Sequence, residues 1–325
     1  MTGVQISSGP LFKFQILILF MKIDIVLGED NFSEQIAKQI NAKFIKIETY
    51  TFPDSEIKLT LKEAELKNKS VLLVLRSKRF KPDINNNVMK IFFISSLLKE
   101  AGANEINLFL PYMFYSRQDK QFLPGETKSF SNIATLYESL GVSNIITINS
   151  HLYGKSPPLQ SFFKKIKVYD QSPAALFADY LKSKNLKEPI VIGPGKGADR
   201  LIQELAGLLD ADFEGLEKER DHRTQVITMK PPKAKLKNKD VVIYDDVSAS
   251  GGTIVPAFEL TQRFKPNRIF IAIPHLITKE GIEKLIKLKS TEIITSDSFV
   301  TEEPMKFTEL SLVPLISNYI KILND

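Results

Sequence analysis

Short apolar runs alternate with helical patterns along most of the chain, and this alternation limits the possible folds more than any other feature. Residues 70–75 (SVLLVL) and 189–194 (PIVIGP) form apolar runs typical of strands buried on both faces of a parallel sheet. Segments with helical spacing, such as 86–103 and 172–185, stand between runs of this kind. Strand–helix alternation predicts parallel sheets covered by helices, and therefore an α/β fold.

The alternation continues through both halves of the chain, which at 325 residues is long enough for two cores. We expect a domain boundary near residue 165, with domains at 21–165 and 166–325. The last helical stretch, 310–324, can pack on either half, including the N-terminal domain. Helices are also expected at 31–41, with Asn31 as its N-cap, and at 131–141. Further strands are expected at 23–28, 44–50, 57–61, 106–112, 144–151, 241–246, 268–275 and 292–297.

Composition excludes several kinds of site. The sequence contains no cysteine, so disulfides, thiolate metal sites and cysteine nucleophiles are excluded. Its three histidines, His151, His222 and His275, are too few for a histidine-rich metal cage. The net charge of +6 is mild and the lysines are spread along the chain, which favours solvated helix faces over a nucleic-acid surface.

The N-terminal segment requires a separate interpretation. Residues 11–20 (LFKFQILILF) are apolar, but this run falls well short of the roughly 20 residues that a membrane span requires. No small-residue cleavage site of a secretory signal follows it. Residues 21–30 (MKIDIVLGED) resemble a second protein start, with a methionine, a strand and a glycine-containing loop. We expect residues 1–20 to lie outside the core, with a hydrophobic anchor as the alternative, and the protein to be cytoplasmic with no membrane partner.

The segment 241–253 (VVIYDDVSASGGT) carries the clearest chemistry. A buried strand ends at Tyr244, and two carboxylates, Asp245 and Asp246, follow it directly. Hydroxyls and flexible backbone N–H groups come next, before a helical pattern, which is the composition of a phosphate cradle at a helix N-terminus. Aspartates in this position could also serve charge complementarity with the helix alone. The expected cradle consists of Ser248, Ala249, Ser250, Gly251, Gly252 and Thr253.

This segment resembles the phosphoribosyl-pyrophosphate motif of the type I phosphoribosyltransferase fold, in which two acidic residues precede a short Thr-Gly-Gly-Thr loop. The resemblance implies that the loop holds the 5-phosphate of a ribose and that Asp245 and Asp246 contact its 2- and 3-hydroxyls. A sugar ring would then separate the carboxylates from the phosphate, which otherwise repel each other.

Further segments resemble ribose-phosphate pyrophosphokinases, especially their archaeal-type form. Residues 51–61 (TFPDSEIKLTL) and 111–121 (PYMFYSRQDKQ) are similar to the adenine-nucleotide segments of that family. An arginine in such a segment supplies the planar fork that a polyphosphate needs. The resemblance implies that ATP is bound by Phe52, Asp54, Glu56, Arg117, Gln118 and Asp119.

Three more segments are similar to the same family. Residues 149–163 (NSHLYGKSPPLQSFF) resemble its Asp-Leu-His segment, which implies that His151 binds Mg²⁺. Residues 193–206 resemble its pyrophosphate loop, and residues 215–229 resemble its catalytic flexible loop. The residues so implied are Gly195, Lys196 and Gly197 for pyrophosphate and Lys218 and Arg220 for catalysis.

The resemblance extends over about residues 21–325 and implies two tandem type I phosphoribosyltransferase-like domains, each a mainly parallel sheet flanked by helices. It implies an Mg²⁺-dependent enzyme that transfers the diphosphoryl group of ATP to the C1 hydroxyl of ribose 5-phosphate and releases AMP. It also implies a homo-oligomer based on dimers, such as a hexamer, with the nucleotide site shared across a subunit interface.

Several positions depart from the pattern of that family. Asn149 and Gly195 stand where the family has acids, while Ala249 and Ser250 replace residues of its phosphate loop. Because Mg²⁺ favours carboxylate and phosphate oxygens, the lost acids weaken the expected metal site. Two alternatives therefore remain open: a weakened or inactive regulatory homologue that binds the same ligands, and a nucleobase phosphoribosyltransferase.

Overall fold

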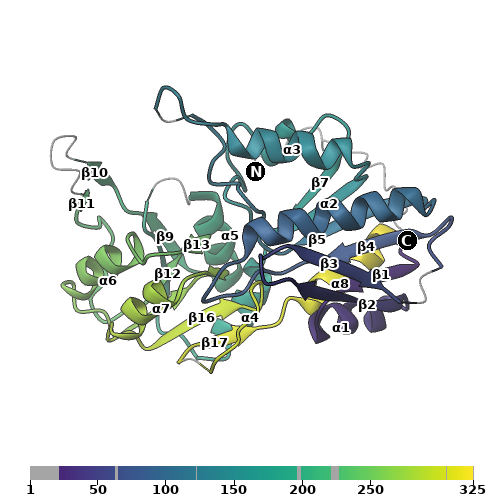
Figure 1. The fold of residues 1–325 in the computed structure, drawn as a ribbon. Coiled ribbons are helices and arrows are strands. Elements are labelled where there is room, and N and C mark those ends of the chain that lie inside the picture. Colours follow the sequence, from purple (N-terminus) through teal and green to yellow (C-terminus); the bar gives the residue numbers. More distant parts are fainter. Residues whose placement is uncertain are drawn as a thin grey trace, which may run out of the picture.

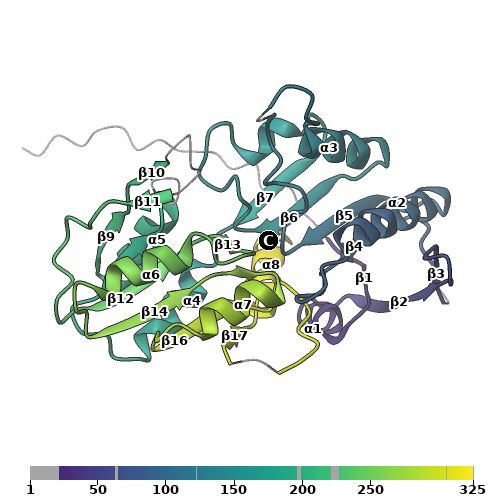
Figure 2. The same cartoon turned by 60° about the vertical axis from the view of Figure 1, so that its left-hand side comes forward.

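The computed structural model describes residues 22–62, 65–121, 123–195, 199–220, 227–304 and 306–324. Two large sheets stand side by side, one in each half of the chain (Figure 1). In the view turned by 60°, helices flank both sheets (Figure 2). The predicted α/β class, with two mainly parallel sheets, is therefore confirmed.

The first sheet has seven strands in the order β3-β2-β1-β4-β5-β6-β7. Neighbouring strands are parallel except β2 and β3, which form an antiparallel hairpin at one edge. The central strand β4 is buried at every residue, which explains its continuous apolar sequence. The strands are β1 Ile25–Gly28, β2 Lys43–Thr51, β3 Ile57–Leu61, β4 Ser70–Val74, β5 Glu105–Leu110, β6 Asn144–Ile148 and β7 Lys167–Gln171.

The second sheet has six parallel strands in the order β17-β16-β14-β12-β8-β9. The single strand predicted at 268–275 is instead divided at Pro274, which has no backbone N–H for a sheet ladder. Its second part, β15, pairs with the short strand β13 outside the large sheet. The strands are β8 Ile190–Gly193, β9 Asp212–Gly215, β12 Asp240–Tyr244, β13 Val247–Ser248, β14 Arg268–Ala272, β15 His275–Leu276, β16 Glu292–Ser296 and β17 Thr308–Leu310.

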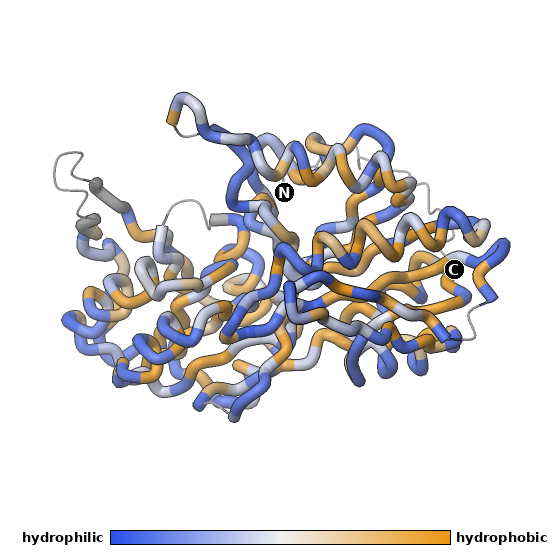
Figure 3. Tube along the Cα trace, in the orientation of Figure 1, coloured by the Kyte–Doolittle hydropathy of each residue, from blue (hydrophilic) through white to orange (hydrophobic). Residues whose placement is uncertain are grey.

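Helices bury an apolar face on each side of both sheets. In the first sheet, α2 and α3 cover one face while α1 and α8 cover the other. In the second sheet, α6 and α7 cover one face while α4 and α5 cover the other. Figure 3 shows the resulting concentration of hydrophobic residues along the strands. The helices are α1 Asn31–Gln39, α2 Ile84–Glu100, α3 Ser129–Ser139, α4 Ala174–Lys182, α5 Asp199–Leu209, α6 Ile254–Gln262, α7 Lys279–Ile286 and α8 Val313–Asn324.

The N-cap of α1 differs from the prediction. Asp30 caps the helix, because its carboxylate accepts a hydrogen bond from the backbone N–H of Ser33 at 3.1 Å. Asn31, the predicted cap, is the first residue inside the helix. Asparagine and aspartate are nearly equal as N-caps, so the sequence pattern did not distinguish two adjacent candidates.

Two segments in the second half of the chain belong with the first sheet rather than with the second. They are β7 at the start of that half and α8 at its end. Strand β7 begins just after the expected boundary near residue 165, yet it forms the edge of the first sheet beside β6. At the other end, α8 packs against α1, where Ile316 and Ile320 are fully buried. The C-terminal segment therefore completes the core of the first sheet.

A buried arginine joins the two halves. The side chain of Arg79, between β4 and α2, is completely buried. Its guanidinium donates to the backbone carbonyls of Leu276 and Ser296, at 2.6 Å and 2.8 Å, and pairs with Glu309 at 2.6 Å. Because these partners all belong to the second half, Arg79 fixes how the two sheets face each other.

A buried histidine makes a second link between the halves. Burial lowers the pKa of His275 to about 4, so its ring is neutral near pH 7. Nε2 donates to the carbonyl of Ile148 at 2.8 Å, which leaves Nδ1 as an acceptor facing the Ser298 hydroxyl at 2.9 Å. Since Ile148 ends β6, this bond sets the position of the residues that follow that strand.

No helix in the described part of the chain combines the length and apolar character that a membrane crossing needs. Residues 1–20, expected to lie outside the core, fall outside the described residues.

Candidate active site

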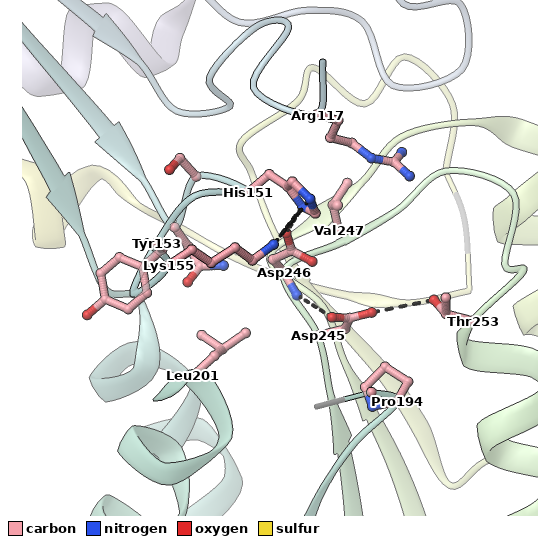
Figure 4. Close-up of a pocket in the computed structure, with 13 residues that line it drawn as sticks. Arg117, His151, Tyr153, Lys155, Pro194, Leu201, Asp245, Asp246, Val247 and Thr253 are labelled. Atoms are coloured by element: carbon pink, nitrogen blue, oxygen red, sulfur yellow. Dashed lines mark hydrogen bonds and ion pairs between the residues drawn. The ribbon is translucent and has the colours of Figure 1, made fainter. Parts of the chain in front are cut away.

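A pocket of about 190 Å³ lies where the carboxyl ends of β6, β8 and β12 meet (Figure 4). This edge of a parallel sheet is where ligands usually bind in α/β folds. Because β6 belongs to the first sheet and β8 and β12 to the second, the pocket is formed by both halves of the chain. Of the residues predicted from the sequence, it brings together Arg117, His151, Gly195, Asp245, Asp246 and Thr253.

Two adjacent carboxylates follow β12 into this pocket. Asp245 accepts hydrogen bonds from the backbone N–H of Asp246 at 3.1 Å and from the hydroxyl of Thr253 at 3.4 Å. Oδ2 of Asp246 lies 2.8 Å from Nδ1 of His151. Burial alone would raise the pKa of Asp246, but His151 and Lys155 outweigh burial and lower it below its ordinary value. Asp246 therefore keeps its negative charge at neutral pH.

His151 stands between two charged groups. Nζ of Lys155 lies 3.1 Å from Nε2 of His151. Because an ammonium group only donates, Nε2 is the acceptor and Nδ1 carries the proton that it donates to Asp246. Burial lowers the pKa of Lys155, and the carboxylates of Asp246 and Asp245 offset part of that effect. Figure 4 shows Lys155 and His151 converging on Asp246, so both ring nitrogens are engaged.

The loop 248–253 joins β13 to the N-terminus of α6, as the sequence predicts for a phosphate cradle. Gly251 has a φ of +75°, a left-handed backbone conformation that favours glycine. Ser248 is buried, and its hydroxyl has no hydrogen-bond partner in the described structure. Of this loop, as far as it is described, only Thr253 lines the pocket.

The predicted nucleotide residues after β5 are only partly brought to the pocket. Arg117 is exposed and lines it, whereas Gln118 and Asp119 do not. The turn is fixed by its backbone, since the N–H of Gln118 donates to the carbonyl of Tyr115 at 2.8 Å. Arg117 extends over the pocket from this turn (Figure 4).

Phe52, Asp54 and Glu56 lie apart from the pocket, at the exposed tip of the β2–β3 hairpin. The backbone N–H of Phe52 donates to the carbonyl of Glu56 at 2.8 Å, and Asp54 accepts from the N–H of Glu56 at 3.1 Å. The ring of Phe52 packs edge-on against Tyr50, with 4.9 Å between centroids. A single chain thus presents these residues to solvent rather than to Arg117.

The two remaining predicted segments are partly described. Gly195 lines the pocket, while Lys196 and Gly197 lie outside the described residues. The segment 215–229, predicted as a loop, contains an antiparallel strand pair, β10 (Lys218–Arg220) and β11 (Ile227–Met229). The prediction of a loop is therefore corrected for these two strands, which carry Lys218 and Arg220 on a hairpin.

The pocket also contains residues that the sequence analysis missed, above all Lys155 and Tyr153. Composition gives no signal for them, because the sequence holds 44 lysines and arginines. Position gave the available signal: Lys155 follows His151 by four residues, in a segment that Gly154 and Pro157 force to turn.

The carboxylates of the pocket suit Mg²⁺. This ion is usually held by one or two carboxylates together with waters and substrate phosphates, and Asp245 and Asp246 supply that number of carboxylates. Across the described ranges, no group of three or more His, Cys, Asp or Glu side chains is arranged to hold a metal ion. A bound Mg²⁺ would therefore depend on substrate phosphates for most of its ligands.

Two family models match the chain. The model for the N-terminal domain of ribose phosphate pyrophosphokinase matches residues 21–141. The model for the phosphoribosyl transferase domain matches residues 167–308. The two matches follow each other in the order of the two sheets.

Relatives and a solved structure match over most of their length. The ribose-phosphate pyrophosphokinase of Sulfurisphaera tokodaii is 29% identical over 301 residues, which are 91% of this chain and 100% of that protein. That of Bacillus cereus is 26% identical over 304 residues, which are 92% and 93% of the two chains. The phosphoribosylpyrophosphate synthetase of Mycobacterium smegmatis has a TM-score of 0.80 at 21% identity, over 92% of this chain and 98% of its own. This last likeness establishes a shared fold.

Proposed function

The chain belongs to the ribose-phosphate pyrophosphokinase family, and we propose that it transfers the diphosphoryl group of ATP to ribose 5-phosphate. The C1 hydroxyl oxygen of the ribose attacks the β-phosphorus of ATP, and the bond from that phosphorus to the bridging oxygen of the α-phosphate breaks. The proton of the attacking hydroxyl is released to solvent. The products are phosphoribosyl pyrophosphate and AMP. The pocket between the two sheets supports this proposal, because paired carboxylates and cationic side chains line it together.

The ribose side of the site is assigned to the second sheet. Asp245 and Asp246 contact the 2- and 3-hydroxyls of the ribose, and the loop 248–253 holds its 5-phosphate. The charge on Asp246, the buried hydroxyl of Ser248 and the N-terminus of α6 support this assignment. A hydroxyl-bearing ring between carboxylates and phosphate removes the repulsion that these groups would otherwise have.

The nucleotide side is assigned to the first sheet. Arg117 contacts the polyphosphate, with Gln118 and Asp119 on the same turn, and a fixed fork of N–H donors suits this ligand. Phe52, Asp54 and Glu56 bind ATP from a second copy of the chain, because their own hairpin points them away from Arg117. This arrangement requires a homo-oligomer.

Catalysis is assigned to positioning and charge stabilisation. Mg²⁺, when bound with ATP, neutralises part of the charge on the transferring group. Gly195, Lys196 and Gly197 hold the pyrophosphate end, and Lys218 and Arg220 stabilise the charge that develops on the transferring oxygens. Asp246 keeps its charge, which holds the 2- and 3-hydroxyls and so positions the ribose for attack by its C1 hydroxyl.

An assay of AMP release tests the proposal. The full chain is incubated with Mg²⁺, ATP and ribose 5-phosphate, and AMP and phosphoribosyl pyrophosphate are separated by chromatography. We expect both products to form together and only when the sugar is present. Lys218→Ala should lower the rate by about 10²–10³-fold, the loss that follows removal of one electrostatic stabiliser. A matched control is Lys289→Met, an exposed lysine between α7 and β16, which should leave the rate unchanged.

Two observations favour an alternative, a weakened homologue that binds the same ligands. Both ring nitrogens of His151 are engaged, and Asn149 brings no charge to the pocket. Calorimetric binding of ATP and ribose 5-phosphate without any AMP release would establish that alternative. Gly195→Asp should then raise the rate, because it returns a carboxylate to the pocket. Pyrophosphate release from phosphoribosyl pyrophosphate and a nucleobase would indicate a phosphoribosyltransferase instead.

A further inference from the structure

Asn149 is enclosed in the pocket without partners. It follows β6, lines the pocket and is 1% exposed. Neither Nδ2 nor Oδ1 of its amide has a hydrogen-bond partner among the described residues. Its backbone is fixed, since its N–H donates to the carbonyl of Gln171 at 2.9 Å. A buried amide that is unpaired at both ends is costly, so a group that enters the pocket is its expected partner.

Lys155 brings a second unsatisfied donor group to the same pocket. Its ammonium has three N–H donors, and the acceptor nitrogen of His151 takes one of them at 3.1 Å. The proton on Nδ1 of His151 prevents that nitrogen from accepting another. Among the residues that the structure describes, two donors of Lys155 therefore remain for a ligand, in a pocket that also receives Arg117.

The turn that carries Lys155 is fastened to the second half of the chain. The hydroxyl of Tyr153 donates to Glu204 of α5 at 2.7 Å. Gly154 has a φ of +69° and approaches Arg200 of α5 so closely that an added Cβ would lie 2.5 Å from its side chain. The position of Lys155 is thus fixed by packing against α5 rather than by chance exposure of a flexible side chain.

We propose that Asn149 and Lys155 bind a phosphoryl oxygen of the transferred diphosphate directly, so that this part of the pocket holds the anion without a metal ion. The ammonium of Lys155 and Nδ2 of Asn149 are donors, and ionised phosphate oxygens are acceptors, which makes these donors complementary to the anion. The lysine also occupies the ring nitrogen of His151 that a metal ion would need. The inference rests on the proposed function for the identity of the anion.

The competing explanation gives Lys155 a structural role. In that case its ammonium only balances the charge of Asp246, and the amide of Asn149 gains no partner from a phosphate. The two explanations differ in one measurable quantity, the affinity for a diphosphate when divalent metal ions are removed.

Titration calorimetry with inorganic pyrophosphate in buffer with EDTA measures that quantity on the full chain. We expect the wild type to bind, and Lys155→Met to weaken binding about tenfold or more, as expected for a lost charge-assisted hydrogen bond. Asn149→Asp should weaken it by a similar factor, because it replaces a donor by a negative charge. Lys155→Arg should retain most of the affinity, and the control Lys289→Met should match the wild type.

Three results would overturn the inference: no pyrophosphate binding by the wild type in EDTA, wild-type affinity in both Lys155→Met and Asn149→Asp, or a weakening that occurs only when Mg²⁺ is present. Circular-dichroism melts verify that each variant is folded. If Lys155→Met is unfolded, the comparison of Lys155→Arg with Lys155→Gln replaces it. Pyrophosphate binding together with no AMP release would reject the proposed function alone, so the two failures are distinguishable.

Discussion

Two clefts at the carboxyl edge of the first sheet contain similar charged residues, but the hydrogen bonding of these residues differs. One is the candidate active site. The other, of about 540 Å³, lies beyond the ends of β1 and β4, and its lining includes Glu29, Asp30, Arg76 and Lys90. The second cleft is larger and also rich in charge, yet Glu29 pairs with Lys90 and Asp30 pairs with Arg76.

The ion pairs in the second cleft are formed between side chains of the protein itself. The ammonium of Lys90 lies 2.7 Å and 2.8 Å from the two carboxylate oxygens of Glu29. Arg76 pairs with Asp30 and donates to the carbonyl of Asp297 at 2.6 Å. In the active-site pocket, by contrast, Asn149 has no partner in the described structure, and Lys155 keeps donors unused. The two clefts therefore differ in the polar atoms that their side chains leave unsatisfied.

Replacement of a charge in the active-site pocket should have the largest effect, and it should act on turnover. Asp246→Asn removes the carboxylate that pairs with His151 and that the proposed function assigns to the ribose hydroxyls. We expect kcat/KM for AMP release to fall by roughly 10²–10³-fold, as when one electrostatic partner of a reacting group is lost. The measurement is the chromatographic assay of AMP release together with a thermal melt. Unchanged kcat/KM in a folded variant would contradict the assignment of Asp246.

A replacement in the second cleft should affect stability instead. Glu29→Gln leaves the buried ammonium of Lys90 beside a neutral amide. Because Glu29 itself is 30% exposed, we expect a loss of about 1–3 kcal/mol of unfolding free energy. Urea unfolding measures this change. The rate of AMP release per folded molecule should equal that of the wild type. A large loss of rate without a loss of stability would mean that the second cleft is also a functional site.

The buried His275 should make the stability of the protein depend on pH. His275 has a pKa of about 4 in the folded protein because it is buried, whereas the unfolded chain takes up that proton near pH 6.5. The unfolded state therefore binds more protons below that pH, and stability should fall by up to about 1.4 kcal/mol for each pH unit between 6.5 and 4.

Urea unfolding at pH 7.5, 6.5, 5.5 and 4.5 measures this slope. His275→Gln cannot take up the proton, so the difference between wild type and variant should shrink as the pH falls. Parallel curves for the two proteins would show that His275 does not titrate in this range.

The sequence predicted the architecture because hydrophobic patterning is local. Strands such as β4 and β12 are buried at every residue, and their apolar runs indicate this without any tertiary information. The position of β7 was harder to predict, since its residues are only half-buried and its sheet is chosen by pairing with β6. The N-cap of α1 was mistaken because two capping residues stand side by side.

The site was predictable where one segment holds its residues together and less so where distant segments meet. Asp245 and Asp246 are placed by the end of β12, and the loop before α6 follows directly. Lys155 reaches the pocket only because the fold brings its turn onto α5. The spacing of residues along the chain does not predict such a contact.

Tyr153→Phe should have the smallest effect and separates positioning from stability. Burial raises the pKa of Tyr153 to about 12, so at neutral pH its hydroxyl keeps the proton that it donates to Glu204. Loss of this bond should lower the unfolding free energy by about 1 kcal/mol. Because the Lys155 turn loses its anchor, we also expect pyrophosphate affinity to fall by a few-fold in the calorimetric titration.

A matched control variant makes this prediction decisive. Tyr180→Phe removes a comparable bond, which joins the hydroxyl of Tyr180 on α4 to Glu292 on β16, and neither residue lines the pocket. It should lower stability by a similar amount and leave pyrophosphate affinity unchanged. Equal affinity in the two variants would show that the bond between Tyr153 and Glu204 only stabilises the fold. A loss of affinity confined to Tyr153→Phe would show that the hydrogen bond between Tyr153 and Glu204 on α5 holds Lys155 where its N–H groups can bind the ligand.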